Sequence, residues 1–453
     1  MTAFSEFTGF AGEQRRRVKL PTYSFEHICC RVQRQNGNSC ATSAGTDSPT
    51  DIANWFYVPS WRRTPLSRIP SVDEMRRRQE CWLVFTSKNE FGSELIRHLE
   101  QQGQEVISVV AGTRFAKLSE VSYKIDVQDQ SHYTALLADL KTPPQRIVHL
   151  WSLNVMAKRP ENGESFERTQ AQSFYSLLFL TQALDELKID HELDLTVVSD
   201  SVQDVTGEEV LSPEKATVLG PSRVLPQEYP NISFRSIDVV LHKSKGSQHK
   251  LVKPVIAEIA ANSPDTFVAY RGTHRWTQSF EPLTVAAELP FTEGVAHIDG
   301  ANIAHLRETI ADARERVGPI KGIFCNLNTS SDDAGPIRSL DIEKCSLRLR
   351  QTANTLAALE SLTTELDFCV LLTSLSSING GRGEITSAAA NHMVAAFAHR
   401  QRQKTQGFWV SLNLDLTITR DEAEKVFQRS LSLNTISQVA VSITDLQERL
   451  ARC

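Results

Sequence analysis

The sequence predicts an α/β protein with two Rossmann-like lobes, each built on a parallel sheet, preceded by an extended linker. Three observations lead to this prediction. Short apolar runs alternate with stretches of helical periodicity between about residues 55 and 280. A second alternating set follows from Ile303 onward. Strands that alternate with helices favour parallel sheets covered on both faces.

The first 53 residues have the composition of a linker. Residues 34–50 are rich in Gln, Asn, Gly, Ser and Thr and contain almost nothing to bury. Leu20-Pro21-Thr22-Tyr23-Ser24-Phe25 precedes this stretch, and its proline favours an extended strap lying on a neighbouring domain. We therefore place a linker at 1–53, a first lobe at 54–283 and a second lobe at 284–453.

The first lobe begins with a buried-strand pattern. Phe91, Leu95 and Leu99 then recur at helical spacing, and Gly103 marks the end of that helix. A longer helix is expected over about 166–187. The expected strands are Trp82–Thr86, Val106–Val110, Ile147–Leu150, Leu195–Ser199, Ile232–Val240 and Thr266–Tyr270.

The second lobe opens with a helix whose apolar face is evenly spaced. Ile303, Leu306, Ile310, Ala313 and Val317 fall at intervals of three and four residues. Further helices are expected at 340–364 and Ala388–Gln401, and the tail Asp421–Arg449 suggests helix, strand, helix. The expected strands are Ile320–Cys325, Phe368–Thr373 and Trp409–Leu414.

Composition narrows the function classes. The chain has 453 residues, 40% hydrophobic and 23% charged, and a formal net charge of −5, which disfavours nucleic acid as a partner. Eight scattered cysteines without a C-x-x-C pair indicate a reduced, cytoplasmic protein and give no zinc spacing, so no metal is expected. No apolar run has the length of a membrane span, so no membrane partner is expected.

Ordered blocks over nearly the whole chain resemble a modular type I polyketide synthase ketoreductase, in the short-chain dehydrogenase superfamily. The first lobe resembles its structural subdomain and the second its catalytic subdomain. Leu20–Phe25 resembles the strap that follows an acyltransferase. The blocks are Trp55–Trp61, Arg146–Leu153, Gly220–Arg223, Val268–Arg271, Gly318–Ile323, Leu366–Phe368, Thr373–Ser377, Ala388–Asn391 and Val439–Leu450.

The resemblance implies NADPH, bound by a glycine-rich loop at the start of the catalytic subdomain, but this chain carries no G-x-G-x-x-G. About a dozen residues join Pro282 to Ala296, whereas a βαβ unit needs about 30. Gly380-Gly381-Arg382-Gly383 follows the wrong strand and is predicted to be a loop. The family's acidic residue on the adenine side aligns with His297. We therefore expect a truncated second lobe with no cofactor. The first lobe, or the 284–296 connection, should cover the sheet edge or helix-binding face left open.

The family's catalytic groups are a serine, a tyrosine, a lysine and an asparagine. Counting from the matching blocks places the serine at Ser374 and the asparagine at Asn391, whereas the tyrosine position is Ser387. The lysine position falls on Arg350. A serine hydroxyl is far less acidic than a phenol, and arginine cannot relay a proton. Both retained residues have a structural alternative, in which they only hydrogen-bond the ends of a strand and a helix.

These losses predict a non-catalytic pseudo-ketoreductase, a structural domain that positions an upstream acyltransferase and a downstream acyl carrier protein. Two alternatives remain. In the first, the chain is an active NADPH-dependent β-ketoacyl reductase whose cofactor loop is not recognised. In the second, a cleft lined by Ser374 and Gly380–Gly383 binds a ketoacyl chain without chemistry. NADPH titration tests the first alternative, and carrier-protein docking without NADPH tests the second.

Overall fold

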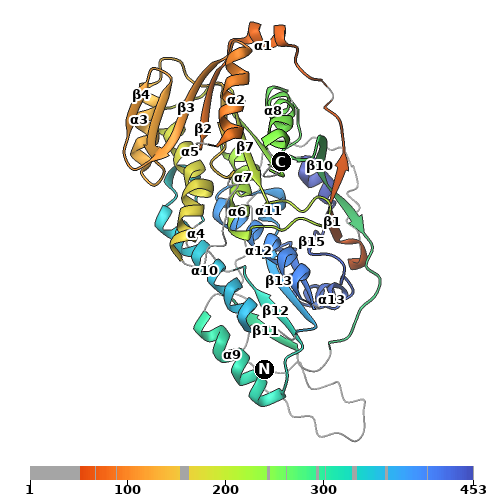
Figure 1. Ribbon diagram of the computed structural model, residues 1–453. Helices are drawn as coiled ribbons and strands as arrows, with labels where there is room; N and C mark the ends of the chain where they lie inside the picture. Colours follow the sequence, from red (N-terminus) through yellow and green to blue (C-terminus); the bar gives the residue numbers. More distant parts are fainter. Residues whose placement is uncertain are drawn as a thin grey trace, which may run out of the picture.

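The computed structural model describes residues 51–451, apart from 67, 88, 154–162, 242–244, 262, 292–294, 301–302, 329–333, 363–365 and 406 (Figure 1). The predicted strap at Leu20–Phe25 and residues 34–50 of the predicted linker lie outside the described residues. The described chain forms two lobes, with the first drawn in red to green and the second in cyan to blue.

The first lobe is a Rossmann-like sheet in the order β9-β8-β7-β6-β2-β3-β5, all parallel, with β4 added antiparallel at the outer edge. Asn89 caps the first helix after β2, and Gly103 (φ +78°) follows its end, as expected for a terminating glycine. The strands are β2 Cys81–Thr86, β3 Glu105–Gly112, β4 Ala116–Ser119, β5 Ser122–Asp126, β6 Arg146–His149, β7 Leu193–Asp200, β8 Ile232–Val239 and β9 Phe267–Arg271.

Helices cover both faces of the first sheet. One face packs on α2 and α8, and the other on α3 and α5. A π-helical turn, Ala171–Tyr175, interrupts the long helix predicted at 166–187. The helices are α1 Val72–Arg78, α2 Glu90–Gln101, α3 Gln130–Asp139, α4 Gly163–Gln170, α5 Ser176–Glu186, α6 Pro213–Ala216, α7 Pro221–Glu228 and α8 Lys245–Ala260, with short 3₁₀ turns at Ile52–Asn54 and Thr217–Leu219.

The second lobe has five parallel strands in the order β11-β12-β13-β14-β15. Its central strand is buried at every position, which is typical of a parallel strand covered on both faces. The strands are β11 Val295–Asp299, β12 Gly322–Asn326, β13 Phe368–Ser374, β14 Phe408–Leu414 and β15 Gln438–Val441. The helices are α9 Ile303–Val317, α10 Ile342–Leu362, α11 Ser376–Asn379, α12 Ile385–Lys404, α13 Arg420–Ser430 and α14 Leu446–Ala451, with a 3₁₀ turn at Ile337–Ser339.

Two antiparallel strands join the lobes into one sheet. β1 (Phe56–Arg63) pairs with β10 (His274–Leu283) on one side and with β15 on the other. On its far side β10 pairs antiparallel with β9. The described strands therefore form a single 15-stranded sheet that runs from β11 to β4. The lobes were predicted as two separate sheets because the pairing of β1 with β15 spans almost the whole chain and has no local sequence signal.

The two faces of the second sheet are covered differently. Helices α9, α10 and α12 cover one face with residues such as Leu306, Leu356 and Phe397. On the other face α13 is joined by the connection between β10 and β11, which adds Val285 and Phe291 to the same hydrophobic cluster and places the ring of Phe291 5.7 Å from that of Phe324 on β12. The connection thus contributes to the cover of this face, as predicted, but it shares the face with α13. The outer edge of β11 pairs with no other strand among the described residues.

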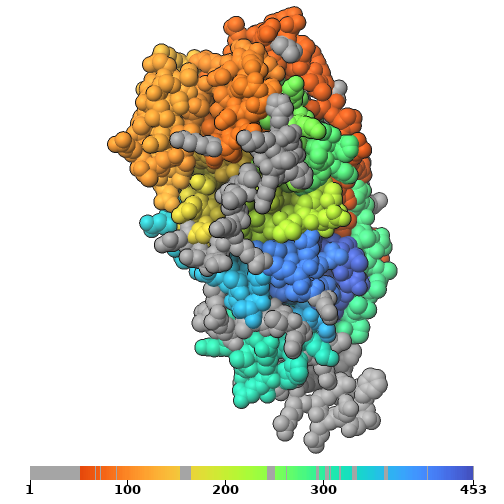
Figure 2. Space-filling view, in the orientation of Figure 1, coloured from red at the N-terminus to blue at the C-terminus, as the bar shows by residue number. Residues whose placement is uncertain are grey.

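One hydrophobic core continues across both lobes, from the first sheet through α5 and α7 into α10 and α12. Helix α12 approaches the first lobe closely at Gly220, where an added Cβ would lie 2.8 Å from the backbone nitrogen of Ala389. In Figure 2 the yellow-green surface of the first lobe lies directly against the blue surface of the second. The lobes thus pack as one body rather than as two linked domains.

Candidate functional site

The predicted site residues Ser374 and Asn391 meet at the carboxyl end of β13. The hydroxyl of Ser374 lies 3.0 Å from that of Ser376. The side-chain amide of Asn391, on α12, lies 3.0 Å from both hydroxyls and 3.1 Å from the carbonyl oxygen of Ser374. One amide nitrogen therefore holds the end of the strand, the start of α11 and the helix α12 together.

This serine–asparagine cluster is closed to solvent. Ser374 is 5% exposed, Asn391 2% and Ser387 8%. The amide of Asn413 on β14 adds contacts of 3.3 Å to the carbonyl oxygen of Ser374 and to the hydroxyl of Ser377. These partners are serine and asparagine side chains, and neither type changes charge near neutral pH. The cluster can therefore hold a strand end in place, but it offers no proton donor matched to neutral pH.

Ser387 lies on α12, one turn before Asn391, on a buried face of the helix. It is the position at which the resemblance places the catalytic tyrosine. Arg350 is not brought to the cluster. It lies on the outer side of α10, its side chain is half exposed, and its Nε lies 3.2 Å from Oε1 of Glu167 on α4. Arg348 faces inward instead and donates to the carbonyl oxygen of Leu327 at 3.0 Å. A count along the sequence could not show which side of α10 faces the sheet.

The first strand of the second lobe does not lead into a dinucleotide cradle. One glycine, Gly300, follows β11, and an added Cβ there would lie 2.6 Å from Leu327 and 3.1 Å from the sulfur of Cys325. The carbonyl oxygen of Gly300 accepts a hydrogen bond of 2.8 Å from Thr355. The chain's own side chains thus fill the space beside this glycine, where a pyrophosphate requires close approach to backbone N–H groups. These residues do not fit an NADPH cradle.

The turn after β2, which is the corresponding turn of the first lobe, offers no dinucleotide cradle either. The N-terminus of α2 is capped internally, since Asn89 Oδ1 accepts from the backbone N–H of Gly92 at 2.8 Å. An added Cβ on Gly92 would collide with the hydroxyl of Thr86. The glycine in this turn therefore serves the packing of helix on strand rather than the approach of a ligand.

His297, at the position of the family's acidic residue, belongs to an aromatic stack. Its ring lies parallel to that of Phe324 with centroids 5.0 Å apart, and Phe291 meets it edge-on at 5.8 Å. Burial lowers the pKa of His297, partly opposed by the charge of Glu424. A neutral ring in a stack supports packing of the connection onto the sheet and provides no charge for a ligand.

The Gly380–Gly383 loop docks on the first lobe. Gln227 Nε2 donates to the carbonyl oxygen of Asn379 at 2.9 Å, and the carboxylate of Glu228 accepts from the backbone N–H groups of Gly383 at 2.9 Å and Ile337 at 2.7 Å. A cleft of about 470 Å³ opens beside it, and Ser374 is not among its lining residues, which are Asp185, Glu228, Tyr229, Ala334, Gly335, Pro336, Arg338, Arg382 and Gly383. The predicted loop is confirmed, with a docking contact that the sequence did not reveal.

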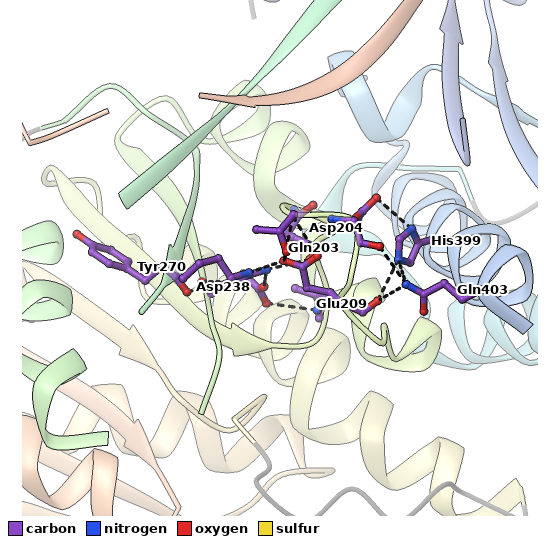
Figure 3. A network of polar contacts seen from close by, with 11 residues as sticks. Gln203, Asp204, Glu209, Asp238, Tyr270, His399 and Gln403 are labelled. Carbon is purple, nitrogen blue, oxygen red and sulfur yellow. Dashed lines mark hydrogen bonds and ion pairs between the residues drawn. The ribbon is translucent and has the colours of Figure 1, made fainter. Parts of the chain in front are cut away.

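A second polar network lies between the lobes, and the sequence did not predict it (Figure 3). It joins Asp238 on β8 and Arg271 on β9 to the segment after β7 and to His399 on α12. Arg271 occurs in a block that carries the family resemblance, but nothing local pairs it with Asp238 or links it to a histidine about 130 residues away. Mutual salt-bridge partners on different strands have no sequence signature of their own.

Among the described residues, no helix is long and apolar enough to cross a membrane. No group of three or more histidine, cysteine, aspartate or glutamate side chains in the described ranges has an arrangement suited to a metal ion.

Residues 278–418 match the family model described as "KR domain". This segment, which includes most of the second lobe, is therefore similar to a KR domain. Residues 80–258, in the first lobe, match a model described as "Beta-ketoacyl synthase-like, N-terminal". No curated protein matches the sequence. The family models thus support the ketoreductase resemblance directly in the second lobe and assign the first lobe to a model of another name.

Solved ketoreductases share the fold of both lobes. "An N-terminal ketoreductase from macrolactin assembly line" is 17% identical, covers 88% of this chain and 93% of its own, and has a TM-score of 0.72. "The first ketoreductase of the tylosin PKS" is 16% identical, with 88% and 95% covered and a TM-score of 0.65. A structure of an "adenylation, ketoreductase, and pseudo Asub" module of an NRPS is 17% identical, with 89% of this chain covered and a TM-score of 0.74, and this chain spans 41% of it.

Proposed function

We propose that this KR domain is a non-catalytic structural unit of a polyketide-synthase-like module. The observation that carries the proposal is the closed cluster at β13, in which the hydroxyl of Ser374 is held by Ser376 and Asn391 while position 387 is a serine. A ketone must reach the hydroxyl that stabilises it and a group that protonates it, and a cluster this buried offers neither.

The packing around the cluster supports a role in holding shape. The lobes share one sheet and one continuous core, and α12, which carries Ser387 and Asn391, packs directly on the first lobe at Gly220. A domain of this kind holds its two ends at a fixed separation. In the proposal an acyltransferase precedes the domain and an acyl carrier protein follows it, in the cytoplasm, with boundaries at residues 53/54 and 283/284.

Cofactor binding tests the proposal. Because Gly300 is packed against Leu327 and Cys325, we expect no saturable NADPH binding by calorimetry or tryptophan fluorescence, and no NADPH consumption with a model ketone. An active ketoreductase of known affinity serves as the positive control in the same cell. A micromolar dissociation constant, or turnover of the ketone above background, would overturn the proposal and favour an active NADPH-dependent reductase.

A further inference from the structure

One segment of the first lobe, Gln203–Glu209, is held by both lobes, and we call it the clasp segment (Figure 3). From the first lobe, Arg271 donates to the carbonyl oxygen of Gln203 at 2.9 Å and to the carboxylate of Glu209 at 2.7 Å. Arg271 is itself held by Asp238 at 2.8 Å. The clasp segment is therefore fixed to the carboxyl ends of β8 and β9.

From the second lobe, His399 contacts the same segment with both ring nitrogens. Its Nδ1 lies 3.0 Å from a carboxylate oxygen of Asp204, and its Nε2 lies 2.9 Å from the carbonyl oxygen of Glu209. Both of these oxygens only accept hydrogen bonds. A ring that donates from both nitrogens is the imidazolium form, because the neutral ring has one donor and one acceptor nitrogen.

Gln403, one turn along α12, gives the neutral ring a different set of contacts. Its Nε2 lies 3.0 Å from Nε2 of His399 and 3.2 Å from the carbonyl oxygen of Glu209. When the ring loses the proton on Nε2, this nitrogen can accept from the Gln403 amide and no longer donates to Glu209. Loss of the proton on Nδ1 would instead end the bond to Asp204. Either neutral form keeps one of the two direct contacts.

We propose that His399 is a pH-sensitive latch between the two lobes, closed while its ring is protonated and loosened when the proton dissociates to water. The latch acts on α12, which carries Ser387 and Asn391 and packs against Gly220. Its release would therefore weaken the hold of α12 on the clasp segment and reduce the contact between the lobes. The inference stands whether or not the domain is catalytic, so its failure leaves the proposed function untouched.

The charges around His399 favour the closed form at low pH. Burial lowers the pKa of His399, but the hydrogen bond and charge of Asp204, with the carbonyl and charge of Glu209, outweigh burial and raise it above 6.5. Burial also raises the pKa of Glu209, but Arg271 and the backbone of Thr206 hold it at about 2, so Glu209 stays charged. Because the folded state binds the proton more tightly than the unfolded chain, the latch contributes fully below about pH 6.5 and is lost as pH rises through the folded value.

Other charged groups nearby are already paired. On α12, Arg400 lies 3.9 Å from Glu214 of α6 and 3.5 Å from Glu360 of α10. Lys215 of α6 pairs with Asp200 at 2.6 Å. Burial raises the pKa of Asp238, behind Arg271, to about 6 against the pull of the arginine, and the carboxyl of Asp238 has a signal of its own, apart from that of the His399 ring. The titration of His399 can thus be separated from that of Asp238 by following each site.

The test uses the intact protein with carbon-13-labelled histidine rings. We expect His399 to titrate above 6.5 and its value to fall toward 6.5 in Asp204→Asn. Hydrogen exchange of the clasp segment, corrected for intrinsic rates, should show more opening at about pH 8.5 than at about pH 6, by roughly tenfold for each unit by which the pKa is raised. In His399→Gln the increase in opening between about pH 6 and about pH 8.5 should be lost.

His132 is the matched control, because it pairs with Asp129 at 3.6 Å in the first lobe, outside the network. His132→Gln should leave the pH dependence of the clasp segment unchanged. Titration of wild-type His399 at or below 6.5 would overturn the proposal without any variant. So would a clasp segment whose opening in the wild type is the same at both pH values.

Discussion

The two lobes build the same kind of parallel sheet and cover it by different means. In the first lobe, helices pack on both faces, with α2 and α8 on one side. In the second lobe, helices α9, α10 and α12 cover one face, whereas the other combines α13 with residues of the β10–β11 connection. The comparison shows that a short connection with apolar side chains can complete the cover of a sheet face on which a helix already packs.

Aromatic side chains make up much of the cover on this face of the second lobe. Phe324 lies at the centre of the covered face, with ring centroids 5.3 Å from Phe427, 5.6 Å from Phe368 and 5.7 Å from Phe291. Rings from the strands, from α13 and from the connection together fill the volume beside the sheet, and edge-to-face contacts add to the burial of area. The first lobe has no need of this arrangement on its α2 and α8 face, where leucine and valine predominate.

The largest effect is expected where this aromatic face is broken. Phe324→Ala should lower the free energy of unfolding by about 3–5 kcal/mol, because Phe324 is 1% exposed and its removal leaves a cavity among the rings of Phe291, His297, Phe368 and Phe427. Urea denaturation followed by circular dichroism measures the change. The partly buried Phe115 of the first lobe is the control, and Phe115→Ala should cost clearly less. Equal losses of unfolding free energy in Phe324→Ala and Phe115→Ala would mean that the aromatic cluster is not a main support of this face.

An intermediate effect is expected at the closed cluster. Asn391→Ala removes the donor to Ser374 and Ser376 and should cost about 1–3 kcal/mol, because buried acceptors lose a hydrogen bond that water cannot replace. Ser176→Ala is the comparison in the first lobe, where the hydroxyl of Ser176 lies 2.8 Å from Nε2 of the buried His149. Burial alone lowers the pKa of His149 to about 3, so this contact is between neutral groups.

We expect Asn391→Ala to cost more than Ser176→Ala, since it removes contacts to three oxygens, whereas the Ser176 hydroxyl contacts one ring nitrogen of His149 and the carbonyl oxygen of Ser173. Thermal and urea unfolding of the two variants give the comparison. A negligible cost for Asn391→Ala would argue that the cluster is retained for a ligand rather than for packing, and the structural proposal would lose its main support.

The smallest effect is expected on activity, when the family's tyrosine and lysine are restored at positions 387 and 350. Ser387→Tyr combined with Arg350→Lys should give no NADPH consumption with a model ketone. Arg350 lies on the outer side of α10 beside Glu167, and Ser387 is too buried for a tyrosine ring to enter without strain. A restored acid contributes about 10²–10⁴-fold, and only when the hydride donor is held in place.

Activity of the double variant above that of the parent would show that the cofactor is bound by residues other than those at Gly300. The single variant Arg350→Lys separates the two changes, and we expect it to fold and remain inactive, because its side chain is half exposed. Thermal unfolding of the double variant is measured in parallel, so that loss of the fold is not mistaken for lack of activity.

The sequence by itself determined the local elements and much of the architecture. The apolar runs at Trp82–Thr86 and Phe368–Thr373 predicted β2 and β13, and the spacing of Leu306, Ile310 and Ala313 predicted α9. These patterns are set by burial of neighbouring residues and can be recognised within a short window. The short connection after Pro282 likewise predicted a second lobe with fewer strands and a face covered from outside.

Only the tertiary structure decided how distant segments meet. β1 pairs with β10 and β15, more than 200 and 380 residues away, and edge pairing of this kind depends on backbone hydrogen bonds that any sequence can form. The direction of Arg350 depends on which side of α10 packs on the sheet, and the contact of His399 with Asp204 depends on the docking of the lobes. Each is fixed by the burial of a common core, and burial of that core is a property of the whole chain.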